Sequence, residues 1–134
     1  MKKLKSAAII LIAACMLLIT GCGDEFTPTS MEFDIVGNST YSATKVCDDK
    51  KLTKEVWNLC TNIIIDYDTE GEMGTEYIYV AFFDDQTDDY GVFTLYSNGS
   101  CCLAEEFDVF YSVKNGEKIY QKLLEYYEQL PENE

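Results

Sequence analysis

The segment Asp66–Glu72 reads Asp-Tyr-Asp-Thr-Glu-Gly-Glu, which matches the first seven positions of a helix-loop-helix calcium-binding loop. Carboxylates at its first, third and fifth positions would supply oxygen ligands, and Gly71 would allow the turn at the sixth. The twelfth position, which requires a bidentate glutamate, is Tyr77, and the flanking runs are β-type where the motif needs helices. We therefore interpret this segment as the acidic turn of a β-hairpin and predict no metal site.

A second group of carboxylates comes together only when the turns are placed on a sheet. In an antiparallel meander, successive turns alternate between the two ends of the sheet. The strand that follows Asn98-Gly99 would then return to the end occupied by residues 84–89. The resulting edge could bind a hard cation or a cationic protein, and the alternative is a solvated acidic rim. The candidate acidic edge consists of Asp84, Asp85, Asp88, Asp89, Glu105, Glu106 and Asp108.

Catalytic chemistry has little support in the sequence. The chain contains no histidine, and nucleophilic catalysis at serine or cysteine usually needs a positioned base, most often histidine. Acidic residues are abundant, but no pair can be assigned to opposite sides of a cleft, as glycoside hydrolysis requires. We therefore predict a protein that is not an enzyme and binds no cofactor.

The N-terminus carries three lysines, at positions 2, 3 and 5, followed by an uncharged apolar run over residues 7–19. As a helix this run would be about 20 Å long, too short for a hydrocarbon core of about 30 Å, so it predicts a cleaved export signal. The segment Ile19-Thr20-Gly21-Cys22 resembles the lipobox of bacterial lipoproteins. That resemblance implies diacylglycerol attachment to Cys22 and cleavage before it. Two acyl chains would hold the protein at a membrane.

The charge of the chain restricts its partners. The formal net charge is −14, with 24 acidic residues and 10 basic ones. Removal of the signal would make the chain more acidic still, because the signal contains lysines and no acidic residue. Such a surface is repelled by nucleic acid and by anionic lipid headgroups, so we predict no nucleic-acid partner. The expected location is the extracytoplasmic face of the cell membrane, as for the small lipoproteins of Gram-positive bacteria that the chain resembles.

Four cysteines remain beyond Cys22, and an even number outside the cytoplasm permits two disulfides. Adjacent strand residues point to opposite faces, so Cys101 and Cys102 are poorly placed to pair with each other. In the predicted hairpin Leu95 opposes Cys102, which would point towards a helix bearing Cys60. We therefore prefer a Cys60–Cys102 bridge, with Cys47–Cys101 as a candidate second, and buried free thiols as the alternative.

Hydrophobic periodicity predicts the elements that would position these groups. Residue alternation indicates strands, and spacings of three and four residues indicate two amphipathic helices, the first capped by Asp48 or Asp49 and the second opening at Asn115-Gly116. Strands or extended segments are expected at Met31–Val36, Thr40–Cys47, Asn62–Asp66, Glu76–Phe83, Tyr90–Tyr96, Cys101–Ala104 and Val109–Val113, and helices over Lys50–Cys60 and from Gly116 to Gln129.

These elements predict an α+β fold, an antiparallel β-meander covered by two amphipathic helices. We expect both helices on one face of the sheet, and one helix on each face is the alternative. We expect residues 1–21 to form the signal, residues 22–30 a lipidated tether and residues 31–134 a single acidic domain. Tyr77 and Tyr79 alternate with aliphatic residues, and Tyr96 would join them on one sheet face. We expect a helix to cover this face; left open, it would suit protein or glycan recognition.

The predicted function is therefore that of a membrane-anchored binding module with a membrane-proximal partner. One alternative is an immunity or inhibitor protein whose acidic edge captures a cationic toxin or enzyme. The other is a lipoprotein that binds a divalent cation.

Overall fold

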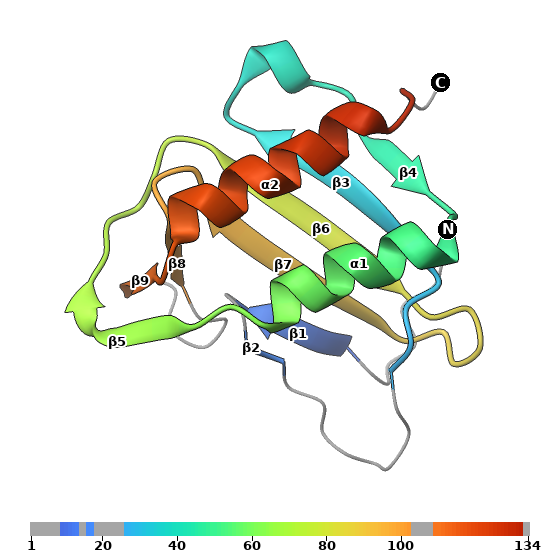
Figure 1. Cartoon of the computed structure of the whole chain (residues 1–134), viewed down its shortest axis with the longest axis horizontal. Helices are drawn as coiled ribbons and strands as arrows, with labels where there is room; N and C mark the ends of the chain where they lie inside the picture. The colour runs from blue at the N-terminus through green and yellow to red at the C-terminus, as the bar shows by residue number, and fades with distance from the viewer. Residues whose placement is uncertain (1–8, 14–15, 18–25, 103–108, 133–134) are drawn as a thin grey trace.

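The computed structural model describes residues 9–13, 16–17, 26–102 and 109–132, the first two ranges as backbone alone. The fold is α+β, as the sequence predicts. Two sheets and two helices make up the architecture (Figure 1). The strands are β1 (Ile9–Ala13), β2 (Met16–Leu17), β3 (Ser30–Val36), β4 (Lys45–Cys47), β5 (Ile65–Glu70), β6 (Tyr77–Phe83), β7 (Tyr90–Tyr96), β8 (Ser100–Cys102) and β9 (Phe110–Val113); the helices are α1 (Lys50–Thr61) and α2 (Gly116–Gln129), with a 3-10 turn at Ser39–Tyr41.

The first sheet has the strand order β2-β1-β7-β6-β3-β4. Its central part, β7-β6-β3-β4, is antiparallel throughout, and β6 and β7 form the predicted hairpin. The pairing of β3 with β6 runs over the full length of both strands, from Ser30 opposite Phe83 to Val36 opposite Tyr77. At the other edge β1 adds to β7 in parallel, and β2 pairs with β1. The antiparallel core therefore rests on β3, β6 and β7.

The second sheet, with the order β5-β9-β8, corrects two predicted hairpins. β8 pairs with β9, so that Cys101 lies opposite Tyr111, and it does not return along β7. β5 also pairs with β9, so the segment Asp66–Glu72 is not a turn between β5 and β6. The predictions failed because both hairpins were inferred from local turn signals, whereas the strand partners are distant in sequence.

The turn at Asn98-Gly99 directs the chain into the second sheet. Gly99 has φ of +84°, and the side chain of Asn98 accepts the Ser100 N–H and donates to the Glu72 carbonyl. A Cβ added at Gly116 would lie 2.5 Å from the Gly99 carbonyl oxygen, so the turn is pressed against the start of α2. Two glycines in contact thus fix where β8 leaves the first sheet.

Both helices lie on the same face of the first sheet, as predicted (Figure 1). Helix α1 is capped by Asp49, whose carboxylate accepts the N–H groups of Lys51 and Leu52. It buries Val56 and Cys60 against the sheet, while α2 buries a stripe made of Tyr120, Leu123 and Tyr127. The core is therefore a single layer between this face and the two helices. Neither described helix is both long and apolar enough to cross a membrane.

The domain begins earlier in the sequence than we expected. Phe26 is only 7% exposed and belongs to the hydrophobic core, and the Thr27 N–H donates to the buried Asp84 carboxylate. The Thr29 N–H donates to the Phe83 carbonyl, which continues the pairing of β3 with β6. Residues 26–30, assigned above to the tether, therefore pack as part of the domain.

Candidate binding face of the central sheet

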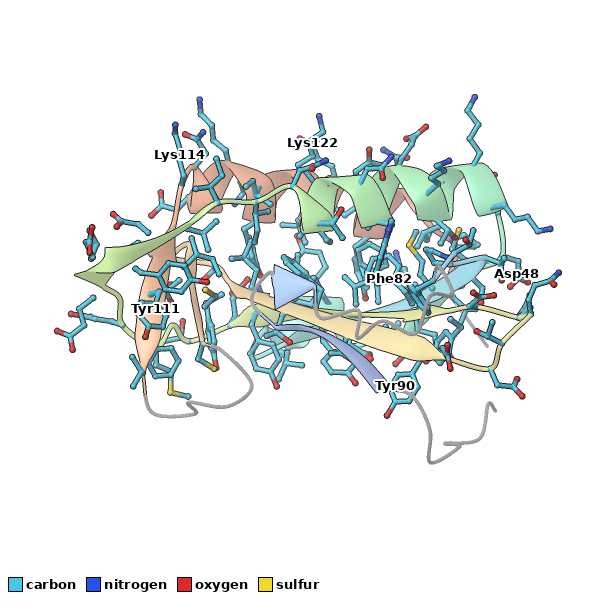
Figure 2. All side chains as sticks on the ribbon, turned by 90° about the horizontal axis from the view of Figure 1, so that it is seen from below. Asp48, Phe82, Tyr90, Tyr111, Lys114 and Lys122 are labelled. Carbon is cyan, nitrogen blue, oxygen red and sulfur yellow. The ribbon has the colours of Figure 1, made fainter. Side chains whose placement is uncertain are left out.

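The face of β3, β6 and β7 that points away from the helices is the candidate functional site, and we call it the open face. Alternate residues of each strand point to it, while the intervening aliphatic residues and phenylalanines are buried beneath the helices. Figure 2 shows this division, with Phe82 between sheet and helices and Tyr90 on the opposite side. The open face consists of Glu32, Asp34, Tyr77, Tyr79, Ala81, Phe83, Tyr90, Val92, Thr94 and Tyr96.

The location of the tyrosines overturns our expectation that a helix covers them. Both helices pack on the aliphatic face because residues such as Ile78 and Val80 gain more from complete burial than tyrosines, whose hydroxyls need partners. On the open face Tyr79 is 36% exposed, and Tyr77 and Tyr90 are half-buried. Tyr96 is only 9% exposed, because its ring also packs against Phe110 at 5.9 Å, so Tyr79 is the most exposed tyrosine on a face that no described helix covers.

Two aromatic pairs mark the ends of the open face. The rings of Tyr77 and Tyr96 lie 5.2 Å apart between centroids, and those of Phe83 and Tyr90 stack at 6.1 Å with an interplanar angle of 28°. Both are cross-strand pairs in direct register between β6 and β7. Tyr79 lies between the two pairs along β6, with Ala81 between Tyr79 and Phe83.

Two carboxylates from β3 lie beside this aromatic surface. Glu32 is paired with Ala81, and Asp34 with Tyr79, in the register of β3 with β6. Burial raises the pKa of Tyr79, and electrostatic interactions with Tyr90, Asp34 and Glu32 raise it further. Asp34 also accepts a hydrogen bond from the Thr44 hydroxyl, which orients its carboxylate. The site therefore combines aromatic rings with anionic oxygens.

The lysines lie elsewhere. Apart from the signal-like N-terminus, they occur in α1, in α2, immediately before α2 at Lys114 and at Lys45. Figure 2 shows Lys114 and Lys122 on the helix side of the molecule. Lys45 points into the core, where its Nζ donates to the Tyr127 carbonyl at 3.1 Å and lies 4.3 Å from the centre of the Tyr127 ring. Within the described residues, the open face carries negative charge without a basic side chain.

The predicted acidic edge is only partly represented in the structure. Asp84 is 2% exposed, and its carboxylate accepts the N–H groups of Thr27 and Gln86, so it holds the β6–β7 turn together. Asp85 and Asp88 are exposed at this turn, and Asp89 is half-buried. Glu105, Glu106 and Asp108 lie outside the described residues. The predicted acidic edge required β8 to pair with β7 and so to return towards the β6–β7 turn. β8 pairs with β9 instead, and both strands lie away from that turn (Figure 1).

The calcium-like segment has a local structural role. The Asp66 carboxylate accepts hydrogen bonds from the Thr69 hydroxyl at 2.6 Å and from the Asp68 N–H at 3.0 Å. These hydrogen bonds lower the pKa of Asp66, first through Thr69 and then through Asp68. They also form a bulge in β5, where its pairing with β9 shifts between Asp66 and Glu70. Among the described residues, no three cysteine, aspartate or glutamate side chains are grouped as a metal site requires.

Cys47, Cys60 and Cys102 are free thiols, so the predicted Cys60–Cys102 bridge is not formed. Cys60 and Cys101 are fully buried, and burial raises the pKa of the Cys60 thiol. Cys102 is half-buried in the second sheet because β8 pairs with β9, so it does not occupy the position opposite Leu95 that the bridge assumed. The alternative of buried thiols therefore describes the structure better.

Sequence reasoning identified Tyr77, Tyr79 and Tyr96 on one face but missed Glu32, Asp34 and the Phe83–Tyr90 pair. The alternation of polar and apolar residues along Ser30–Val36 was visible, and it already placed both acids on one side of a strand. The alternation along one strand does not show which other strand lies beside it.

Comparison of the chain with protein-family models, with curated proteins and with solved structures gave no match.

Proposed function

We propose that this chain is a membrane-anchored extracytoplasmic lipoprotein, not an enzyme, whose open face binds a basic surface of another protein. The observation that supports this proposal is the open face itself, where aromatic rings and two carboxylates lie together without a lysine among the described residues. Tyrosine provides apolar contact area and a hydroxyl at little cost in side-chain entropy, which suits protein recognition.

The charge distribution favours a basic partner. Lysine and arginine side chains can lie on the face of a tyrosine ring and pair with a neighbouring carboxylate. Tyr79 between Glu32 and Tyr90 offers both contacts at one place. Negative charge on the open face would also steer a basic partner into contact and repel acidic ones. An inhibitor or immunity protein that captures a cationic toxin is one form of this function, with the open face replacing the acidic edge as the contact surface.

Membrane anchoring through Cys22 would restrict where such a partner is found. Phe26 is packed in the domain, so at most four residues, 22–25, would connect the lipid to it. Four residues reach at most about 14 Å when fully extended. The partner would therefore be a membrane protein, or a protein that passes close to the membrane surface.

The test is site-specific crosslinking on intact cells. A photoreactive benzoylphenylalanine replaces Tyr79 in one strain and Gln121, an exposed residue of α2, in the control strain. We expect a basic protein to be captured from position 79 and not from position 121. Capture should fall as the NaCl concentration rises from about 0.05 M to about 0.5 M, because salt screens the charges.

Two results would contradict the proposal. Equal capture from both positions would mean that contact is not specific to the open face. No capture from position 79, in cells where the protein is present at the membrane, would mean that this face has no protein partner.

A further inference from the structure

A groove of about 630 Å³ opens between α1, the start of the domain and the β6–β7 turn. Its walls come from three separate parts of the chain, residues 26–29, the first two turns of α1 and residues 84–87. Its volume lies in the range of small-molecule sites, roughly 300–1,000 Å³. The groove is separate from the open face, since α1 covers the opposite side of the sheet (Figure 1).

The floor of the groove is aromatic and firmly held. The rings of Phe26 and Trp57 lie 5.0 Å apart, and Trp57 also packs edge-on against Phe82 at 5.0 Å. Phe26 and Phe82 are buried, whereas Trp57 is half-buried and lines the groove. An apolar group entering the groove would therefore meet a preformed surface that needs no rearrangement.

The wall opposite α1 is held by Asp84. Both of its oxygens accept backbone N–H groups, one from Thr27 at 3.0 Å and one from Gln86 at 2.9 Å. The hydrogen bond from Thr27 joins the start of the domain to the β6–β7 turn. The Asp84 carboxylate therefore serves the structure of the wall.

The α1 side of the groove is cationic. Lys50 and Lys54 both line it, one helical turn apart. Among the described residues neither ammonium group has an ion-pair partner. The net charge of the whole chain is strongly negative, but charges farther than about 8 Å are largely screened at physiological ionic strength. The lining of the groove contains these two lysines and one carboxylate, that of Asp84, so its formal charge is positive, in contrast to the negative net charge of the whole chain.

We propose that this groove binds an anionic phospholipid. The apolar part of the lipid near its glycerol would lie on Phe26 and Trp57, and the phosphate would lie between Lys50 and Lys54. If Cys22 carries the lipid anchor, a membrane would supply this ligand at high local concentration. This source of the ligand rests on the function proposed above, whereas the groove does not. Binding would orient the domain with α1 towards the bilayer and the open face away from it.

The test uses the chain from residue 22 with Cys22→Ser, which is the expected mature chain without its lipid and, like that chain, lacks β1 and β2. Trp57 is the single tryptophan of the chain, so its fluorescence reports directly on the groove. Dihexanoyl phosphatidylglycerol is added below its micelle concentration, in parallel with dihexanoyl phosphatidylcholine and with glycerol phosphate. We expect saturable binding of phosphatidylglycerol, at least about tenfold tighter than that of either comparison compound.

Matched charge variants complete the experiment. The double variant Lys50→Gln/Lys54→Gln should weaken phosphatidylglycerol binding about tenfold or more. The control Lys118→Gln/Lys122→Gln removes the same charge with the same spacing from α2, which lies outside the groove, and should change the affinity less than about twofold. Thermal unfolding of each variant checks that the fold is retained.

Several outcomes would overturn the proposal. Absence of a saturable fluorescence change would mean that the groove binds no phospholipid. Equal affinity for phosphatidylcholine would remove the role of the lysines, and equal affinity for glycerol phosphate would remove that of the aromatic floor. An equal loss in the two double variants would show a general effect of charge. None of these results would affect binding at the open face, which is measured by crosslinking from position 79.

Discussion

The two faces of the central sheet are built from the same strands, yet they differ in almost every physical property. On the covered face, β6 places Ile78, Val80 and Phe82 in full burial beneath the helices. On the open face the same strand places Tyr77, Tyr79 and Phe83 at the surface or in half-burial. The comparison teaches that one strand can build the core with its even-numbered residues and a chemically different, partly exposed surface with its odd-numbered ones.

Truncation of one aromatic residue on each face gives the largest expected difference in stability. Phe82→Ala should lower the free energy of unfolding by about 3–5 kcal/mol, because it leaves a cavity beneath α1. Tyr79→Ala should cost about 1 kcal/mol or less, since its ring contributes mainly cross-strand contacts. Both values come from urea unfolding monitored by circular dichroism. Equal losses would mean that the open face is itself a core surface, covered in the native protein.

A second comparison, at alkaline pH, is between the buried Tyr120 of α2 and Tyr79 of the open face. Burial raises the pKa of Tyr120, and the hydrogen bond from its hydroxyl to Glu76 at 2.6 Å raises it further. The unfolded chain therefore releases the tyrosine proton first, at a pKa of about 10. The contribution of Tyr120 protonation to the free energy of unfolding is complete below about pH 10. Above that pH it decreases by up to about 1.4 kcal/mol per pH unit.

The variant Tyr120→Phe should therefore lose less stability than the wild type between about pH 10 and 11.5. Tyr79→Phe is the control on the open face. The pKa of Tyr79 is also raised, but its ring is partly exposed, so the pH dependence should change less. Unfolding midpoints in urea at each pH provide the measurement. Identical pH profiles for Tyr120→Phe and the wild type would contradict the assigned role of the hydroxyl.

Neutralising the carboxylates of the open face should have the smallest effect on stability. Glu32→Gln/Asp34→Asn is expected to change the free energy of unfolding by no more than about 0.5 kcal/mol, since both side chains lie at the surface of the sheet. The same variant should reduce crosslinking from position 79, because the proposed contact depends on these charges.

Glu117→Gln/Glu125→Gln, on exposed positions of α2, removes the same charge on the helix side and should leave crosslinking unchanged. Loss of capture in both variants would show that net charge, and not the open face, attracts the partner. A large loss of stability in Glu32→Gln/Asp34→Asn would show that these residues have a structural role.

Prediction from sequence succeeded where the signal was local. The boundaries of α2 and β7, and a cap on α1 by Asp48 or Asp49, followed from periodicity and cap chemistry within a few residues. The structure shows that the cap is Asp49. It failed for β5 and β8, which find their partner in β9. Turn signals at Asn98-Gly99 indicate that the chain reverses, but they carry no information about which distant strand receives it.

For the candidate site, the sequence showed that tyrosines share one side of β6 but not whether that side is covered. Whether the tyrosine side is covered depends on which face of the sheet the helices bury. The residues of all the strands in the sheet contribute to that outcome. The cysteines illustrate the same limit, since the preferred Cys60–Cys102 bridge rested on the wrong partner for β8.

The sequence by itself determined the α+β class, the two helices, the acidic charge and the alternation of residues along β3, β6 and β7, because each depends on composition or on neighbours along the chain. Only the tertiary structure decided that the tyrosines remain open, that Glu32 and Asp34 join them, and that Phe26, Trp57 and Lys54 enclose a groove. These features bring together residues far apart in the chain, and their positions depend on how the helices and sheets bury apolar surface as a whole.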